Sequence, residues 1–320
     1  MTNCELESNT TVVDVTYLCN ARCRYCKWGD KSTGDRSHRS LQEILLPEEV
    51  LKALGTQRLV LSGGEPLLNP QISEILAYYS KLVDELIIIT NGYNLNRSGV
   101  NRLIASGVTG ITVSLDSIHE SEVFETRKTS AQLLTSLLER LNEISKMPRN
   151  FELGINAVVS HPTANWITVR DLLEYGSGLR VDFVKFQPIF DDGYVGRNSS
   201  QLVLSHVDSE NLRTVAKMID TIAHPLTNPS SFWQDLASLT LGEILPATSC
   251  GLGLGHSILT KDSLNICYWL DSSSFGSIDS INSLEAKRTR IDFERKKQVC
   301  KVGYHCFCTQ NISHVWNKSD

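Results

Sequence analysis

Short apolar runs alternate with segments of helical spacing through the first two thirds of the chain. Six of these runs have the length of buried strands: Val12–Leu18, Arg58–Ser62, Leu86–Thr90, Gly110–Leu115, Phe151–Val159 and Asp182–Gln187. The segments between and after them repeat apolar residues at helical spacing, which predicts helices at Glu48–Leu54, Ile72–Leu82, Val100–Ala105, Gln132–Lys146, Ile167–Tyr175, Asp208–Ala223 and Phe232–Leu239. Strands that alternate with helices favour a parallel sheet with helical crossovers, and therefore an α/β fold.

Polar residues collect where the expected strands end. The segments that follow these ends are Cys19–Cys26, Ser62–Glu65, Asn91, Ser114–Asp116, and Gln187 with Asp191 and Asp192. They are rich in cysteine, glycine and polar side chains, whereas the strand interiors are apolar. Because ligands of parallel sheets bind at the carboxyl ends of the strands, we expect a single binding edge there.

Three cysteines, Cys19, Cys23 and Cys26, have the spacing C-x3-C-x2-C directly after the first expected strand. A [4Fe–4S] cube is normally closed by four cysteines, one on each iron. Three thiolates on one short loop would leave one iron open to a substrate or cofactor, and the cluster would then act as a catalyst. The alternative is a zinc site, although zinc favours paired C-x2-C units or an added histidine.

The composition limits the partners and the compartment. The chain has 320 residues, a formal net charge of −5 and nine cysteines. This mild acidity argues against a nucleic-acid partner and is compatible with a neutral or cationic small molecule. Met1–Thr11 is polar and lacks the apolar core of a signal peptide, and the longest apolar runs have only strand length. We therefore expect a cytoplasmic protein without a membrane partner, in which clustered cysteines favour metal over disulfides.

The cysteine motif and a second motif together closely resemble those of radical S-adenosylmethionine (SAM) enzymes. The second motif is S-G-G-E-P at Ser62–Pro66, after the second expected strand, and the resemblance covers roughly residues 11–190. It implies that SAM chelates the open iron through its amino and carboxylate groups. It also implies that a reductant such as flavodoxin or ferredoxin drives cleavage of SAM to a 5′-deoxyadenosyl radical, which abstracts hydrogen from an unactivated carbon. The expected fold is then a partial (β/α)6 barrel of the TIM type with parallel strands.

The resemblance assigns SAM-binding roles to the second motif. Gly63 and Gly64 would let the backbone approach the ligand closely, and Glu65 would pair with the ammonium group of SAM. Without the upstream cysteines, the glycine pair would be an ordinary turn and Glu65 a solvated loop charge. Because the two motifs follow consecutive expected strands, each one supports the role assigned to the other.

Four further residues match SAM-side positions of these enzymes. Tyr25, between the second and third cysteines, occupies the position beside the adenine. Ser114 and Asp116, in V-S-L-D-S, match polar positions near the ribose or the methionyl group, and Gln187 is an adenine-side candidate. The alternative for Ser114 and Asp116 is that they cap the segment that follows.

The last part of the chain resembles the small auxiliary-cluster domains called Twitch and SPASM. Two strand-like runs, Ser257–Thr260 and Leu264–Trp269, flank a turn and predict a β-hairpin. We therefore expect a radical SAM partial barrel at residues 1–225 and a Twitch-like domain at residues 226–320.

Five cysteines of this region are candidate ligands of one auxiliary [4Fe–4S] cluster: Cys250, Cys267, Cys300, Cys306 and Cys308. Cys250 and Cys267 have the separation of the Twitch pattern, although Asp262 stands where that pattern has glycine. The remaining cysteines are too few for the two-cluster SPASM pattern, so one auxiliary cluster fits better. A zinc ion on the same cysteines is the alternative.

One of the five cysteines is left over if the cluster takes four. A free thiol near the substrate, for which Cys308 and Cys300 are the candidates, would return a hydrogen atom to the opposite face of a carbon radical and make the enzyme an epimerase. If the thiols are all ligands or buried, the expected outcome is oxidation, with the auxiliary cluster accepting an electron. A buried, inert thiol is the usual state of a single cysteine.

The substrate is the least constrained feature of the sequence. Asp191, Asp192 and Tyr194 follow the sixth strand and would suit a polyhydroxylated or amino-bearing molecule, although D-D-G is also an ordinary turn. We expect a small polar natural product that resembles a sugar or an aminoglycoside. A ribosomally made peptide is the alternative, disfavoured because the first motif cysteine already stands at Cys19. A zinc-stabilised binding protein without turnover is the alternative from another class.

Overall fold

The structure is a computed structural model that describes residues 9–26, 28, 37–189, 201–222, 227–243, 256–260, 263–266, 275, 281–282, 285–286 and 288–289. Its sheet has the strand order β6-β5-β4-β3-β2-β1-β7-β8. The strands are β1 (Asn9–Thr16), β2 (Thr56–Gly63), β3 (Glu85–Thr90), β4 (Gly110–Ser114), β5 (Glu152–Val159), β6 (Phe183–Pro188), β7 (His256–Leu259) and β8 (Leu264–Asn265). Neighbouring strands from β6 to β7 are parallel, and the α/β prediction is therefore confirmed.

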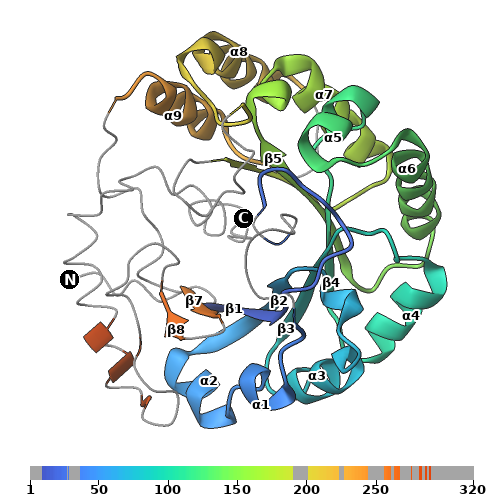
Figure 1. The fold of residues 1–320 in the computed structure, drawn as a ribbon, viewed down its shortest axis with the longest axis vertical. Helices are drawn as coiled ribbons and strands as arrows, with labels where there is room; N and C mark the ends of the chain where they lie inside the picture. Colours follow the sequence, from blue (N-terminus) through green and yellow to red (C-terminus); the bar gives the residue numbers. More distant parts are fainter. Residues whose placement is uncertain are drawn as a thin grey trace.

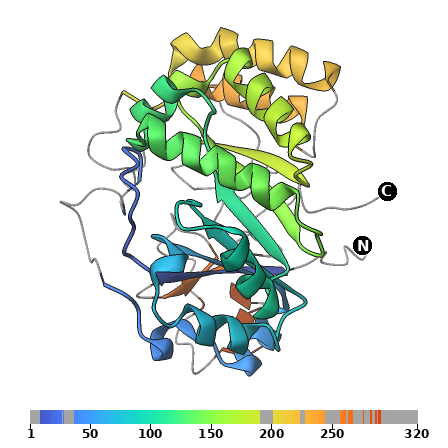
Figure 2. The ribbon, with the colours of Figure 1, turned by 90° about the vertical axis from the view of Figure 1, so that its right-hand side faces the viewer.

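The helices lie on the outer side of the curved sheet (Figure 1). They are α1 (Leu41–Ile44), α2 (Glu48–Leu54), α3 (Ile72–Tyr79), α4 (Arg97–Ala105), α5 (Glu120–Arg127), α6 (Ala131–Ser145), α7 (Trp166–Gly178), α8 (Ser209–Met218) and α9 (Ser230–Thr240). Together with the sheet they make a partial barrel, seen from the side in Figure 2. No helix among these described elements is both long and apolar enough to cross a membrane.

Alternation along the strands separates the two faces of the sheet. In β4, Ile111 and Val113 are buried in the core under the helices, so Ser114 belongs to the inner face of the barrel. In β6, Val184 and Phe186 are buried in the same core, which leaves Lys185 and Gln187 on the inner face. Each fully buried Leu, Ile, Val or Phe contributes about 1.5–3 kcal/mol, so this outer layer stabilises the fold and leaves the inner face to polar side chains.

The helix α5 was not expected from the sequence. Its buried residues are Val123, Thr126 and Arg127, so it presents no continuous apolar stripe. Helix predictions rest on such a stripe, and a helix that buries a threonine and an arginine escapes them. The short α1 was missed as well, since its four residues bury only Ile44.

The hairpin expected in the second domain is present and belongs to the main sheet. β7 and β8 are antiparallel, with Ile258 opposite Asn265, and β7 lies parallel to β1. The sheet therefore continues across the boundary expected between residues 225 and 226. Beyond the same boundary, the ring of Trp233 in α9 meets that of Phe186 in β6 edge-on, with centroids 5.0 Å apart. The division into two domains stays a prediction.

Candidate active site

The three motif cysteines lie on the loop that follows β1. Cys23 is 9% exposed, whereas Cys19 and Cys26 are half-buried, and none of these three cysteines is in a disulfide. Tyr17 before the loop stacks on Trp28 after it, with ring centroids 4.4 Å apart and planes inclined by 22°. Trp28 therefore packs against the base of the loop.

The glycine pair brings the end of β2 against the start of the cysteine loop. Gly63 has a φ of +116°, and a Cβ on it would lie 2.3 Å from the carbonyl oxygen of Thr16. A Cβ on Gly64 would lie 2.1 Å from the carbonyl oxygen of Leu18. The N–H of Gly64 donates to the oxygen of Thr16 at 2.7 Å, and the N–H of Glu65 donates to that of Leu18 at 2.8 Å. Here the close approach serves the protein's own backbone, and the SAM contact predicted for the pair stays a prediction.

The carboxylate of Glu65 is buried and joins the ends of β2 and β3. Its Oε1 accepts from the hydroxyl of Thr90 at 2.7 Å and from the N–H of Leu67 at 3.2 Å, while Oε2 accepts from the N–H of Asn91 at 2.7 Å. Burial raises the pKa of Glu65, and these donors oppose the shift. A carboxylate has about four acceptor positions, so one is left for the ammonium of SAM, the partner that the sequence predicts.

Asp116 is the centre of a buried network beside the cysteine loop. Its Oδ2 accepts from the phenol of Tyr25 at 2.7 Å, and its Oδ1 accepts from Arg127 Nη1 at 3.3 Å and from the N–H of Val158 at 3.1 Å. The side chain of Asp116 is 0% exposed and that of Arg127 is 5% exposed. The network joins the loop, β4, α5 and β5.

Arg127 carries a buried positive charge, which suits a site whose ligands are negatively charged. Burial by itself lowers the pKa of Arg127, but Cys23, Tyr25 and Asp116 favour its cation and raise the pKa well above the usual value. Nothing in the sequence placed Arg127 against Asp116, because the helix that carries Arg127 was not expected. The only signal was a basic residue soon after V-S-L-D-S, which does not distinguish it from a surface arginine.

Backbone contacts also fasten the loop to α5. The N–H of Arg24 donates to the oxygen of Thr126 at 2.9 Å, and its side chain donates to the oxygen of Glu125 at 3.3 Å. The cysteine loop is thus held at the end of β2 through the bond between Leu18 and Glu65, and at the end of α5 through Arg24. Such support on both sides fixes the positions of the three thiols.

The residue types on this loop suit an iron–sulfur cluster. Among the described residues no three His, Cys, Asp or Glu side chains are gathered so as to hold a single metal ion, whereas the thiolates of a cube each bind a different iron. Three thiols occupy one loop, and the side-chain amide of Asn91 lies 3.9 Å from the sulfur of Cys19. Burial raises the pKa of Cys19 to about 11 and raises that of Cys23, so both thiols keep their protons at neutral pH until a metal displaces them. Cys19, Cys23 and Cys26 are the residues that would hold the cluster.

A row of polar side chains crosses the inner face near the carboxyl ends of the strands. Ser114 in β4 pairs with Asn156 in β5, which pairs with Lys185 in β6. Ser114 and Asn156 are half-buried, and Lys185 is 7% exposed. Gln187, two residues after Lys185, lies half-buried on the same face. The predicted SAM residues Ser114 and Gln187 are therefore brought to one face, where Asn156 and Lys185 lie beside them.

Several predicted residues lie outside the described part of the chain. These are the substrate candidates Asp191, Asp192 and Tyr194 and the auxiliary-cluster candidates Cys250, Cys267, Cys300, Cys306 and Cys308. Their roles, including hydrogen donation by Cys308 or Cys300, stay predictions.

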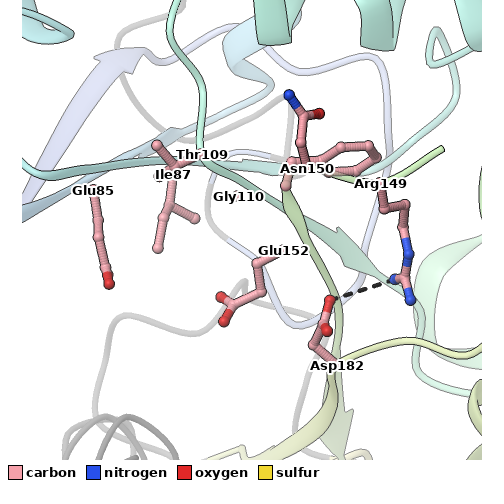
Figure 3. A pocket seen from close by; sticks show the side chains of 9 residues that line it. Glu85, Ile87, Thr109, Gly110, Arg149, Asn150, Glu152 and Asp182 are labelled. Atoms are coloured by element: carbon pink, nitrogen blue, oxygen red, sulfur yellow. Dashed lines mark hydrogen bonds and ion pairs between the residues drawn. The ribbon is translucent and has the colours of Figure 1, made fainter.

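A cavity of about 360 Å³ lies at the other end of the barrel (Figure 3). Its lining includes Glu85 at the start of β3, Glu152 at the start of β5, and Asp182 just before β6. Asp182 pairs with Arg149 at 3.4 Å. The cavity is at the amino ends of the strands, whereas the cysteine loop follows a carboxyl end, so the two are separate.

Solved structures with the same fold include one bound to AdoMet and one bound to a precursor peptide. The chain aligns with anSMEcpe bound to AdoMet with a TM-score of 0.63 and 17% identity, over 94% of this chain and 88% of that one. It aligns with SuiB of Streptococcus suis bound to the precursor peptide SuiA with a TM-score of 0.62 and 15% identity, over 86% and 64%. At such identities the likeness concerns the fold.

Curated relatives carry the name GTP 3′,8-cyclase. That of Photorhabdus laumondii is 35% identical over 33% of each chain, and that of Synechocystis sp. is 31% identical over 60% of this chain and 58% of its own length. That of Ectopseudomonas mendocina is 27% identical over 82% of this chain and 79% of its own length. The chain thus spans less than two thirds of the first two relatives. Residues 13–178, more than half of the chain, match the family described as the radical SAM superfamily. The chain belongs to the radical SAM superfamily.

Proposed function

We propose that the protein reductively cleaves SAM at a [4Fe–4S] cluster on Cys19, Cys23 and Cys26 and abstracts a hydrogen atom from a small polar substrate. The observation that carries this proposal is the cysteine loop itself. The loop is held at the carboxyl edge of the sheet by the backbone bond from Glu65 to Leu18 and by the bond from Tyr25 to Asp116. When bound, the cluster and SAM supply an electron and a 5′-deoxyadenosyl radical.

The residues of the chain orient SAM and keep the site dry. Glu65 has one acceptor position left beside its three donors and would take the ammonium group. Tyr25 keeps its ring in place through Asp116, so that the ring can lie beside the adenine. Gly63 and Gly64 leave no room for side chains between β2 and the loop. Ser114 is positioned on the inner face for the polar part of SAM.

The polar row on the inner face supports an oxygen-rich substrate. Asn156 and Lys185 add amide and ammonium donors to the hydroxyl of Ser114, and such donors suit hydroxyl and carboxylate groups. A sugar-like molecule fits this chemistry, whereas the amino groups of an aminoglycoside-like molecule would be taken by the carboxylates predicted at Asp191 and Asp192. Epimerisation or dehydrogenation would follow hydrogen abstraction, with Cys308 or Cys300 as the hydrogen donor of the epimerase and an auxiliary cluster as the electron acceptor of the dehydrogenase.

Two other substrate classes have specific support. The curated relatives are named GTP 3′,8-cyclase, which favours a nucleotide, and the longest of the three alignments with them given above covers 82% of this chain. The structure of SuiB with its precursor peptide favours a peptide. The experiment described next tests both a nucleotide and a peptide as the substrate.

The test is SAM turnover by the anaerobically reconstituted full-length protein with dithionite. We expect 5′-deoxyadenosine to form in the wild type and not in Cys23→Ala, which lacks one cluster ligand. A panel of aminated sugars, GTP and precursor peptides in deuterated water then identifies the substrate by its new product. One deuterium at carbon supports epimerisation, and loss of two hydrogens without deuterium supports dehydrogenation. A colourless, zinc-containing protein that leaves SAM intact would overturn the proposal.

A further inference from the structure

Asn91 is buried between the Glu65 carboxylate and the cysteine loop. It is 6% exposed and directly follows β3. Its backbone N–H donates to Oε2 of Glu65 at 2.7 Å, and its Oδ1 accepts from the N–H of Tyr93 at 2.9 Å. The first bond holds the backbone of Asn91, and the second orients its side-chain amide.

That amide group faces the cysteine loop. Nδ2 donates to Oδ1 of Asn20 at 2.7 Å and lies 3.9 Å from Sγ of Cys19. An amide carries two N–H donors, so one can serve Asn20 while the other serves the sulfur. Cys19 is a ligand of the proposed cluster, and Asn91 is the neighbour that offers its sulfur a side-chain donor among the described hydrogen bonds.

Hydrogen bonds to the sulfurs of a cluster change its reduction potential. A donor withdraws electron density from the ligand sulfur and stabilises the more negatively charged, reduced cluster. Residues that contact the ligands in this way often matter nearly as much as the ligands themselves. A fixed amide beside Cys19 is placed to do this.

We infer that Asn91 is a positioning residue of the cysteine loop and that its amide raises the reduction potential of the cluster on Cys19, Cys23 and Cys26. The inference rests on the proposed function, because it requires that cluster. Glu65 would then also help to position the amide donor, because it holds the backbone of Asn91.

The chain contains a matched control in Asn69. Asn69 is 1% exposed, its Oδ1 accepts from the N–H of Gln71 at 2.9 Å, and its Nδ2 donates to the carbonyl oxygen of Val15 at 2.7 Å. Asn69 and Asn91 therefore make the same turn with the residue two positions on, and both donate to the segment that contains β1 and the cysteine loop. Only Asn91 also reaches a sulfur among the described contacts.

The experiment compares the wild type, Asn91→Ala and Asn69→Ala as reconstituted full-length proteins. Iron is quantified first. The cluster is then titrated with dithionite, and the reduced form, one electron per cluster, is followed by the electron paramagnetic resonance (EPR) signal that Cys23→Ala lacks. We expect the midpoint potential of Asn91→Ala to be more negative than that of the wild type, and that of Asn69→Ala to be unchanged. Asn91→Asp, which keeps the acceptor for Tyr93 and loses the donor, should shift in the same direction.

The outcomes separate the inference from the proposed function. If the wild type binds no iron, both the proposed function and the inference are overturned. If the wild type binds iron and either Asn91→Ala or Asn91→Asp has the same midpoint potential as the wild type, the inference is overturned and the proposed function stands. Loss of iron from both Asn91 variants also overturns it, because Asn91 would then serve assembly rather than the potential.

Discussion

The phenol of Tyr25 donates to Oδ2 of Asp116 at 2.7 Å, and this bond ties the cysteine loop to the end of β4. Asp116 in turn holds Arg127 and the N–H of Val158. Because Asp116 is fully buried, each of these donors replaces a water molecule that the carboxylate would otherwise need. The position of the three thiols therefore depends on residues from β4, α5 and β5.

Removing the phenol of Tyr25 should weaken iron retention. Tyr25→Phe keeps the ring and leaves Oδ2 of Asp116 without this donor, at a cost of about 1–3 kcal/mol in the free energy of unfolding. Urea denaturation measures the stability, and iron analysis after anaerobic gel filtration measures retention. The control is Tyr175→Phe, which loses a bond from a half-buried phenol to the oxygen of Leu138. Equal iron in both variants would contradict the prediction.

Removing the buried cation should cost more than removing the phenol. Arg127→Met leaves the carboxylate of Asp116 buried without its ion-pair partner, and we expect a loss of about 3–5 kcal/mol in the free energy of unfolding. The double variant Asp116→Asn/Arg127→Met should be more stable than the sum of the single effects predicts, by about 0.5–3 kcal/mol. Chemical denaturation of the wild type, Asp116→Asn, Arg127→Met and the double variant measures this coupling. Strict additivity would show that the two side chains act independently.

The glycine pair should tolerate no side chain. In Gly64→Ala, a Cβ 2.1 Å from the oxygen of Leu18 would force β2 and the cysteine loop apart. We expect a folded protein with reduced iron content, measured by circular dichroism and iron analysis. Gly178→Ala is the control, since a Cβ at the end of α7 meets nothing within 4 Å, and it should be neutral or more stable by up to about 1 kcal/mol. Full iron content in Gly64→Ala would refute the packing role of the glycine.

The auxiliary cluster is tested by counting iron. With two cubane clusters, the wild type should hold about eight irons per chain, and Cys250→Ala/Cys267→Ala about four. The triple variant of Cys19, Cys23 and Cys26 to Ala should keep the other four. If the Cys250/Cys267 variant retains all the iron of the wild type, these two cysteines are not cluster ligands.

The sequence predicted the elements whose apolar residues follow a regular period. The six barrel strands are each within about three residues of their expected ends, and α2 has the expected bounds, because a buried outer face requires that period. It could not predict α5, whose buried residues are Thr126 and Arg127 with a single apolar residue, Val123. The contact between Arg127 and Asp116 could not be predicted for the same reason.

The pairing of strands that are far apart in the sequence could not be predicted either. The hairpin β7–β8 was expected, but its place beside β1 depends on contacts such as that between the hydroxyls of Thr11 and Ser257, 2.7 Å apart. Nothing in two short apolar runs identifies a partner so distant in the chain. Likewise, G-G-E predicted a close approach at Gly64 without revealing that the approached group is the backbone of Leu18.

The central claim is an open iron on the cysteine loop, and the most direct measurement is the EPR spectrum of the dithionite-reduced protein before and after addition of SAM. The account predicts a cluster signal that changes when SAM is added and that is missing in Cys23→Ala. An iron-free protein, or a cluster signal that SAM leaves unchanged, would contradict it.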